Sequence, residues 1–361
     1  MIRRALELAA EGIGLVSPNP LVGCVIVSRE REIVGEGTYL YDSVTHAEVA
    51  ALAQAGERAI GGTAYVSLEP HAHHGKTAPC TEALIDAGIS RVVAAIEDPN
   101  PLVSGKGFQA LRDAGIEVVT GTLAAEAAKL NEKFICWHEK GRPFVHLKMA
   151  MSLDGRISLG RSISTAFSGE AALKRVHEMR HEHDAILVGA NTVIVDDPSL
   201  TDRSGLKRRR KLVRVILDNR LRTSADSTVA RTARETPTII VSNSTDEEKR
   251  KALAGNGVEL IVEDARNLPA VLSALRRREI QSILVEGGTK VAGGFRDASL
   301  IDKLSLMMAP RIIGGNDAPL AFGGHGAASI EEAASLTDIS ITRHGDDIEV
   351  TGYFDFDSTA P

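Results

Sequence analysis

Short apolar runs alternate with amphipathic stretches through the first part of the chain. The apolar runs have the length of buried strands, so we expect strands at 22–27, 64–68, 92–96 and 116–119. Amphipathic stretches at 46–55, 80–87 and 108–114 are each followed by a glycine, which is typical of helix ends. A longer amphipathic stretch, 123–139, predicts one continuous helix. This alternation predicts an α/β sandwich around one sheet.

The alternation resumes after Gly141-Arg142-Pro143, a segment that ends the long helix. We therefore expect a domain boundary near residue 142, with one domain at 1–142 and another at 143–361. In the second domain, strands are predicted at 145–149, 185–188, 213–217, 239–241, 260–262 and 283–285, and helices at 170–182, 247–254, 269–277 and 290–297. The pattern therefore predicts a second α/β domain, and no internal repeat relates the two halves.

Composition narrows the class of protein. With 361 residues, 43% of them hydrophobic and 25% charged, the chain can bury two ordinary cores. The net charge of -6 argues against a general nucleic-acid partner. Cys24, Cys80 and Cys136 are scattered without a pairing pattern, which favours a reducing compartment. Because no apolar run reaches transmembrane length, we expect a cytoplasmic protein with no membrane partner.

Polar residues at two predicted helix starts have the spacing of a metal site. His46-Ala47-Glu48 opens one helix, and Pro79-Cys80 opens the next, after a loop that contains Pro70-His71. Zinc-dependent nucleobase deaminases carry H-x-E followed by P-C-x-x-C. Three protein ligands leave a fourth position for water, and a carboxylate beside that water can carry protons. We expect His46, His71 and Cys80 to bind zinc and Glu48 to be the catalytic residue.

His71 stands in the slot that a cysteine occupies in that signature. Imidazole binds zinc but is neutral, so a set of two histidines and one cysteine leaves the metal more positive than one histidine with two thiolates. His73 and His74, in the same loop, are alternative ligands. Two other interpretations stay open at this point: a polar turn with incidental histidines, and a domain that has lost its metal.

A glycine-rich turn in the second domain predicts a phosphate site. Glu286-Gly287-Gly288-Thr289 follows an apolar run and precedes a helix, whose N-terminus favours negative charge. Since the spacing differs from G-x-G-x-x-G, an ordinary tight turn is the alternative. Lys148 is either a phosphoribosyl or proton-relay contact or a solvated strand end. Asp154-Gly155 is typical of a turn.

Two clusters of charged or titratable residues are expected to lie on the surface and not to form binding sites. The basic segment 207–211 lies before a predicted strand in an acidic protein, so we expect a solvated loop. His177, His181 and His183 lie on and beside a predicted helix, with no carboxylate or thiolate in the pattern to complete a metal set. We expect these histidines to form an exposed helix face.

Motifs along nearly the whole chain resemble the bifunctional deaminase/reductase family of riboflavin biosynthesis. In the first half they are 17–27, 34–37, 76–80 and 97–103 together with the His46 motif, and in the second half 147–156, 192–203 and 285–289. The resemblance implies a cytidine-deaminase-like α/β/α sandwich followed by a dihydrofolate-reductase-like α/β domain. It also implies Zn²⁺ and NADPH as cofactors, a small phosphoribosyl pyrimidine as substrate, and a homo-oligomer.

The resemblance also implies roles for individual residues. The NADPH contacts it implies are Ala150, Ala166, Thr192, Asp196, Asn219, Gly288, Thr289, Lys290, Val291, Ala292, Gly293 and Gly294. The substrate contacts it implies are Asn19, Lys76, Asn100, Lys148, Ser164, Leu200, Arg203 and Glu286. Arg203 suits a phosphate because a guanidinium fork matches phosphate oxygens. Ala166 departs from the family pattern, which usually has tryptophan at this position.

Two successive reactions follow from the resemblance. The first domain is expected to remove the 2-amino group of 2,5-diamino-6-(5-phosphoribosylamino)pyrimidin-4-one by hydrolysis. The second is expected to reduce the ribosyl group to ribityl with NADPH, giving 5-amino-6-(5-phosphoribitylamino)uracil. The alternatives are a reductase whose metal-deficient deaminase domain serves as a scaffold, and a non-catalytic pyrimidine- or RNA-binding module. Glu48 argues against both, because a scaffold needs no proton shuttle.

Overall fold

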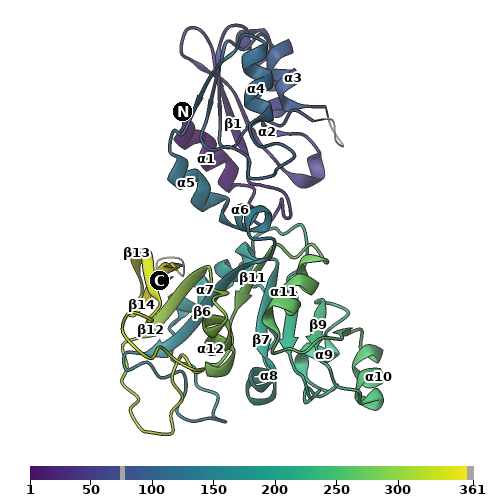
Figure 1. Cartoon of the computed structure of the whole chain (residues 1–361), viewed down its shortest axis with the longest axis vertical. Coiled ribbons are helices and arrows are strands. Elements are labelled where there is room, and N and C mark those ends of the chain that lie inside the picture. The colour runs from purple at the N-terminus through teal and green to yellow at the C-terminus, as the bar shows by residue number, and fades with distance from the viewer. Residues whose placement is uncertain (74–77, 356–361) are drawn as a thin grey trace. The chain divides into compact units, whose positions relative to one another are not determined.

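A computed structural model describes residues 1–73 and 78–355 and divides into two compact units (Figure 1). The first unit contains Met1–Arg142 together with Lys207–Arg209, and the second contains Pro143–Leu206 and the chain from Arg210 onward. Most of the basic segment 207–211 therefore groups with the first unit, which its sequence did not indicate. Among the described residues, no helix is long and apolar enough to cross a membrane.

The first unit is built on one five-stranded sheet with the order β2-β1-β3-β4-β5. The strand β1 is antiparallel to both of its neighbours, whereas β3, β4 and β5 are parallel. The strands are β1 (Gly23–Val27), β2 (Ile33–Thr38), β3 (Thr63–Val66), β4 (Arg91–Ala94) and β5 (Glu117–Thr120). The helices are α1 (Ile2–Ala10), α2 (Ala47–Ala55), α3 (Cys80–Asp86), α4 (Lys106–Asp113), α5 (Ala124–Leu130) and α6 (Glu132–Glu139), with 3-10 turns at Tyr41–Ser43 and Gly56–Ala59.

Alternate residues of β1 pack against helices on opposite faces of this sheet, as the two-residue repeat of a strand requires. Cys24 and Ile26 belong to the core that α2, α3 and α4 cover. Val25 and Val27 belong to the core beneath α1. The predicted α/β/α sandwich is therefore confirmed.

The strand β2 was missed by the sequence pattern because two of its residues are glycines. A Cβ atom at Gly35 would lie 2.0 Å from the carbonyl oxygen of Ala51, and one at Gly37 would lie 2.1 Å from that of Ala47. Helix α2 thus rests directly on the backbone of β2. This close approach sets the position of the helix that carries Glu48 and is preceded by His46.

The single helix predicted at 123–139 is wrong, because Asn131 interrupts it. Asn131 has φ -100° and ψ 18°, outside the helical range, and lies between α5 and α6. Its buried side chain accepts a hydrogen bond from the Leu21 backbone N–H at 2.8 Å and donates one to the Leu21 carbonyl at 2.9 Å. Pairing with a distant loop therefore outweighs the local helical pattern.

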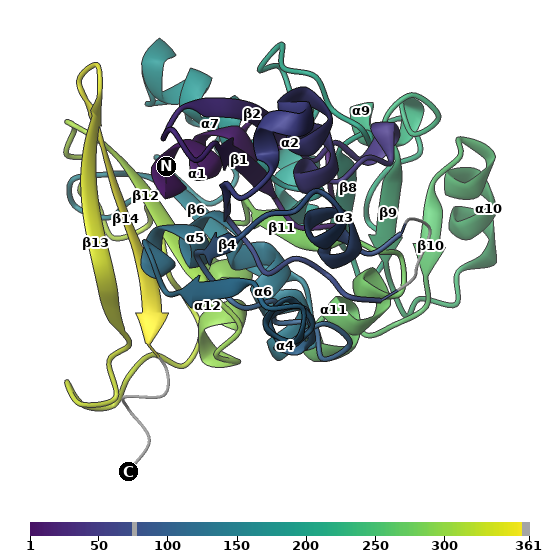
Figure 2. The ribbon, with the colours of Figure 1, turned by 90° about the horizontal axis from the view of Figure 1, so that it is seen from above.

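The second unit contains a nine-stranded sheet with the order β10-β9-β8-β7-β11-β6-β12-β14-β13. All neighbours are parallel except around β14, and Figure 2 shows β13 and β10 at opposite edges. The strands are β6 (Phe144–Ser152), β7 (Ala185–Gly189), β8 (Val213–Leu217), β9 (Thr238–Val241), β10 (Glu259–Ile261), β11 (Ser282–Val285), β12 (Lys303–Ala309), β13 (Ser335–His344) and β14 (Asp347–Asp355). The helices are α7 (Glu170–Glu182), α8 (Ala190–Asp196), α9 (Thr228–Arg231), α10 (Glu247–Gly255), α11 (Leu268–Arg276) and α12 (Thr289–Asp297).

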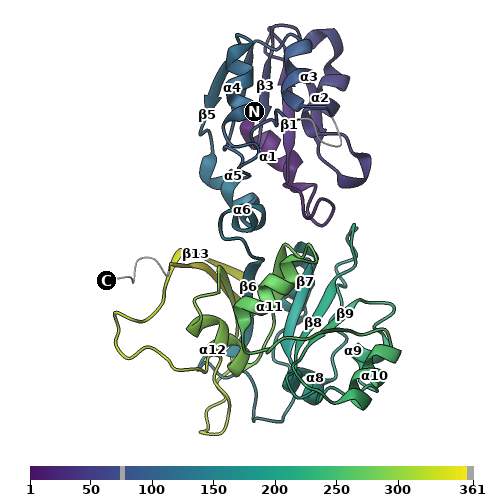
Figure 3. The same ribbon diagram turned by 45° about the vertical axis from the view of Figure 1, so that its right-hand side comes forward.

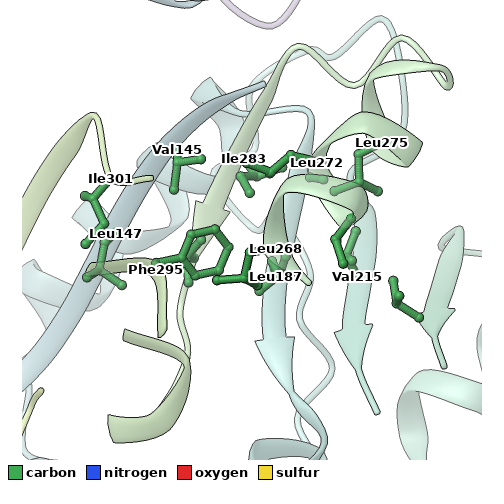
Figure 4. Packing of buried hydrophobic residues seen from close by; sticks show 14 of the residues in the cluster. Val145, Leu147, Leu187, Val215, Leu268, Leu272, Leu275, Ile283, Phe295 and Ile301 are labelled. Carbon is green, nitrogen blue, oxygen red and sulfur yellow. The ribbon is translucent and has the colours of Figure 1, made fainter. Parts of the chain in front are cut away.

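Helices cover both faces of the long sheet, whose strands β7, β8 and β9 are seen side by side in Figure 3. On one face, leucines of α11 and Phe295 of α12 pack on Leu147, Leu187 and Val215 (Figure 4). On the other face, side chains of α8, α9 and α10 pack on Ile216 and its neighbours, and α7 packs on Leu284. The predicted α/β class of this domain is confirmed.

The pattern missed α8, α9 and the three strands β12, β13 and β14. Most residues of β13 are exposed, and polar residues predominate in it, so it lacks the apolar run on which strand prediction depends.

The expectation of an exposed histidine face is also wrong. His181 and His183 are only 4% and 2% exposed, and they form hydrogen bonds with Asp202 at 3.3 Å and with the Met179 carbonyl at 2.7 Å.

Replacing Asn131 by alanine tests the link between α5, α6 and the loop at Leu21. The variant leaves the Leu21 backbone groups without these partners, so the free energy of unfolding should fall by about 1–3 kcal/mol. Urea unfolding followed by the fluorescence of Trp137, the chain's one tryptophan, measures this change. Gln109→Ala, which removes only an exposed hydrogen bond to Asp113, is the control. Equal stability of both variants would contradict the role of Asn131.

Candidate active sites

Three of the predicted metal ligands meet at the ends of two helices. His46 is the N-cap residue of α2, Cys80 is the first residue of α3, and His71 lies in the loop after β3. One ligand atom from each of the three lies within 4.8 Å of the others. The rings of His46 and His71 stack with their centroids 4.5 Å apart. Imidazole nitrogens and a thiol at this separation suit a tetrahedral zinc ion.

The backbone before His71 is fixed by a buried carboxylate. Glu69 accepts hydrogen bonds from four backbone N–H groups, those of Asp98, Gly105, Gly107 and Phe108, at 2.9–3.2 Å. A Cβ atom at Gly107 would lie 1.9 Å from the Pro70 carbonyl oxygen, so the start of α4 packs against this loop. The backbone N–H of Thr81 also donates to the His71 carbonyl at 3.3 Å. The loop is therefore held on both sides of the ligand.

The Glu48 side chain is buried beside the predicted metal ligand Cys80. It is 3% exposed, and its Oε2 has no hydrogen-bond partner within the described part of the chain. Its carboxyl group also forms a hydrogen bond with the Cys80 side chain. Burial raises the pKa of Glu48 above that of an ordinary glutamate. A buried carboxylate oxygen beside three metal ligands, without a protein partner, fits a water or substrate that would complete the site.

The protonation of the ligands also fits a metal. Burial, with further contributions from His46 and His73, lowers the pKa of His71 to about 4. The imidazole is therefore neutral near pH 7, which is the form that binds zinc. Burial and the nearby Glu48 raise the pKa of the Cys80 thiol, and a bound cation would reverse that shift by favouring the thiolate.

Other predicted residues of this domain lie as follows. The exposed His73 is not part of the ligand set, although its ring lies 5.2 Å from that of His71. Asn19 donates to the Tyr39 hydroxyl at 2.6 Å, and Asn100 accepts from the Leu102 backbone at 3.1 Å. His74 and Lys76 lie outside the described residues.

In the second domain, two basic residues converge on Glu286, which follows β11. The Arg180 guanidinium donates to both oxygens of Glu286, at 2.7 and 3.1 Å, and the Lys148 Nζ lies 3.6 Å from Oε2. Burial alone would raise the pKa of Glu286, but Arg180 and Lys148 outweigh it and lower that pKa to about 2. Lys148 is thus a buried member of a charge cluster, not a solvated strand end.

Arg180 belongs to this charge cluster, although no sequence motif predicted it. It lies on α7, among polar residues with helical spacing, and no local motif distinguishes it. Its partner Glu286 is separated from it by 106 positions. Only the fold, which packs α7 against the end of β11, brings the two together.

Arg180 also reaches the loop that contains the predicted substrate contacts Leu200 and Arg203. Its Nη1 donates to the Thr201 carbonyl at 3.0 Å. Leu200 is buried with φ +49°, and the exposed Arg203 donates to the Ser199 hydroxyl at 2.6 Å. Ser164 and Ala166 lie in an exposed segment outside the helices and strands, so neither is packed into this cluster.

The glycine-rich turn leads into α12 as predicted. Gly288 is its N-cap residue, and the nearest heavy atom to a Cβ atom placed there would be 4.0 Å away, so space lies open beside the helix N-terminus. A Cβ atom at Gly287 would instead lie 2.5 Å from the Cβ of Val291. Such a cradle fits a dinucleotide phosphate, because unpaired N–H groups at a helix N-terminus bind anions.

The remaining residues predicted to contact the cofactor differ in their access to solvent. Ala292 is fully buried in the core, and Gly293 packs against the backbone of Gly323, so neither is accessible to solvent. The Asn219 amide is engaged by Asp264 and by the Ala265 backbone. Residues at least partly accessible to solvent are Ala150, Thr192, Asp196, Asn219, Gly288, Thr289, Lys290, Val291 and Gly294.

Comparisons with known proteins match both domains. The model of the cytidine and deoxycytidylate deaminase zinc-binding region matches residues 1–96, and that of the RibD C-terminal domain matches residues 143–350. The riboflavin biosynthesis protein RibD of Bacillus amyloliquefaciens is 42% identical, with 96% of this chain and 94% of that protein covered. The RibD of Actinobacillus pleuropneumoniae is 40% identical, with 96% and 93% covered.

Solved structures give the same result over the whole chain. Acinetobacter baumannii RibD has a TM-score of 0.87 and 36% identity, with 98% of each chain covered. A Thermotoga maritima protein described as a diaminohydroxyphosphoribosylaminopyrimidine deaminase/5-amino-6-(5-phosphoribosylamino)uracil reductase has a TM-score of 0.85 and 36% identity, with 98% of this chain and 97% of that chain covered.

These matches confirm the predicted fold class and the prediction of two activities that use Zn²⁺ and NADPH on a small-molecule substrate. They favour this prediction over a reductase with an inert scaffold and over a non-catalytic binding module. The chain belongs to the RibD family, the bifunctional deaminase/reductases of riboflavin biosynthesis.

Proposed function

We propose that residues 1–142 form the deaminase domain and residues 143–361 the reductase domain, acting in turn on one phosphoribosyl pyrimidine. The deaminase domain converts 2,5-diamino-6-(5-phosphoribosylamino)pyrimidin-4-one to its deaminated product with release of ammonia. The reductase domain reduces the ribosyl group of that product to ribityl, giving 5-amino-6-(5-phosphoribitylamino)uracil. The observation that carries the first step is the convergence of His46, His71 and Cys80 beside the buried Glu48.

In the deaminase domain, His46, His71 and Cys80 would hold the metal. Zinc, when bound, supplies a Lewis acid that activates water for attack on the ring carbon that carries the amine. Glu48 takes a proton from the attacking water and delivers one to the leaving nitrogen. Its burial suits this exchange, because a raised pKa makes the carboxylate a stronger base toward the water than an ordinary glutamate is.

In the reductase domain, the open N-terminus of α12 would hold NADPH, with further contacts from Ala150, Thr192 and Asp196. Arg203 and the Leu200 loop bind the phosphate of the substrate. Arg180, Lys148 and Glu286 face the sugar, and the carboxylate of Glu286 accepts hydrogen bonds from sugar hydroxyl groups in addition to those of Arg180.

We also propose that the enzyme is a cytoplasmic homo-oligomer. Its three cysteines are buried and form no disulfide, which suits a reducing compartment. The edge strand β13 is mostly polar but exposes 57% of Ile339 and 72% of Ile341, and the unpaired backbone groups of an exposed edge strand can pair with another chain. Sedimentation velocity of the purified protein tests the proposal, and a monomer at micromolar concentration would refute it.

The metal set predicts about one zinc per chain. His46→Ala should lose the metal, because two ligands remain. His73→Ala, an exposed histidine outside the set, is the matched control and should keep it. His71→Cys should release zinc more slowly to a chelator, since a thiolate adds a negative charge beside the metal. Elemental analysis measures the content, and loss of zinc from His73→Ala alone would show that the ligand set is wrong.

Glu48→Gln separates the two activities. The amide cannot carry protons, so deamination should fall by roughly two to four orders of magnitude. Zinc content and NADPH-dependent reduction of an already deaminated substrate should stay near those of the wild type. Both rates are followed on the purified full chain. Equal loss of the two activities would argue against independent sites.

Arg203→Ala tests the phosphate contact. Charge-assisted hydrogen bonds worth about 1.5–3 kcal/mol are lost, so the KM for the phosphorylated substrate should rise by roughly 10-fold to 100-fold. The dissociation constant of NADPH should hardly change. Arg277→Ala, an exposed arginine at the end of α11, is the control for general loss of positive charge. A fall in NADPH affinity alone would assign Arg203 to the cofactor instead.

A further inference from the structure

Arg214 on β8 is a fully buried arginine whose hydrogen bonds go to neutral oxygens. Its exposed fraction is 0%. Its guanidinium donates to five acceptors at 2.8–3.0 Å: the Thr238 and Thr232 hydroxyls and the carbonyls of Ser199, Val229 and Thr236. Among the described residues, none of these hydrogen-bond partners is a carboxylate.

Such a residue is costly to bury, because a charged group loses its hydration in the interior. Burial lowers the pKa of Arg214 to about 10, with a small opposing effect of Glu235, so the group is still charged near pH 7. The fan of five acceptors matches the five N–H groups of a guanidinium, which a lysine cannot reproduce. The site is therefore built for an arginine and not simply for a positive charge.

The bond to the Ser199 carbonyl links this buried group to the reductase site. Ser199 directly precedes Leu200, whose φ of +49° is strained for a residue with a branched side chain. The Ser199 hydroxyl accepts a hydrogen bond from Arg203 at 2.6 Å. Two residues along, the Thr201 carbonyl accepts one from Arg180 at 3.0 Å. Arg214 thus anchors one end of the segment from which Leu200 and Arg203 project.

The other hydrogen bonds of the Arg214 guanidinium connect it to regular secondary structure. Val229 and Thr232 belong to α9 and its C-cap, and Thr238 begins β9. The guanidinium therefore joins the loop to a helix and to two neighbouring strands, β8 and β9, which form part of the core. A loop with a strained residue keeps its geometry only when surrounding contacts fix it.

We infer that Arg214 is a positioning residue for the reductase: it fixes the Ser199 carbonyl and thereby holds Leu200 and Arg203 in place for the substrate phosphate. This role rests on the phosphate contact proposed above for Arg203. Arg214 acts through the loop and does not itself touch the substrate. Its loss should therefore weaken recognition of the phosphorylated pyrimidine more than it weakens binding of NADPH.

The test compares Arg214→Met with Ile216→Ala in the full-length protein. Ile216 lies two residues along the same strand and is also fully buried, so its truncation disturbs the same core without removing a bond to the loop. Arg214→Met should raise the KM for the phosphorylated substrate by about 10-fold or more, since a small misplacement of a binding group is costly. The dissociation constant of NADPH, measured by fluorescence titration, should stay within about two-fold of the wild type for both variants. Ile216→Ala loosens the core that Ile216 shares with Leu200 but keeps the hydrogen bond to Ser199, so it should raise the KM far less than Arg214→Met does.

Arg214→Lys distinguishes fork geometry from charge, and it carries the test if Arg214→Met does not fold. It keeps the charge but not the five hydrogen bonds, so it should also raise the KM. A wild-type KM in the folded Arg214 variants would overturn the inference, as would parallel losses of substrate and NADPH binding.

A double variant separates this inference from the proposed function. If Arg214 acts through Arg203, the KM of Arg203→Ala combined with Arg214→Met should rise by less than the product of the single effects. A raised KM in Arg203→Ala beside an unchanged one in Arg214→Met overturns only the positioning role. An unchanged KM in Arg203→Ala overturns the phosphate assignment, and with it the inference that depends on it.

Discussion

Both sites depend on burying charged groups without leaving them unsatisfied. A charge that loses its water must gain hydrogen bonds or an opposite charge, or the fold loses several kilocalories per mole. Glu69 gains four backbone N–H groups, and Glu286 gains the bidentate Arg180 and the nearby Lys148. Each of these bonds ties segments that are distant in the sequence. The loops that carry the functional side chains are therefore held by charge satisfaction rather than by apolar packing alone.

The two domains apply this constraint differently. In the deaminase domain, Glu48 keeps one buried oxygen without a protein partner, while a neighbouring carboxylate, Glu69, is fully engaged. The unpartnered oxygen of Glu48 is available to water and substrate, whereas the carboxylate of Glu69 is not. In the reductase domain, Glu286 already forms ion pairs with Arg180 and Lys148, and its low pKa keeps it negatively charged near pH 7. It can accept hydrogen bonds there, but it has no proton to give.

The sequence predicted features whose determinants are local. Apolar runs located β1 and β3 to β11, and the grouping of the three proposed metal ligands could be predicted because two of them lie at helix starts and the third lies in the loop between β3 and α3. Asn131 and Arg180 could not be recognised, since their partners Leu21 and Glu286 are 110 and 106 positions away. The strand β2 was hidden by its glycines, and β13 by its polar residues. In each case, contacts distant in the sequence decided the outcome, and a local pattern cannot show such contacts.

The glycine pair of β2 has a consequence for how variants of this enzyme are interpreted. Because α2 lies on the bare backbone of Gly35 and Gly37, a side chain at either position would displace the helix that bears Glu48 and begins after His46. The change would occur on the strand beneath the catalytic helix, yet its effect would be a deaminase with misplaced ligands. A loss of deaminase activity after substitution at these positions therefore reflects the packing of α2 on β2 and not a lost contact with zinc or substrate.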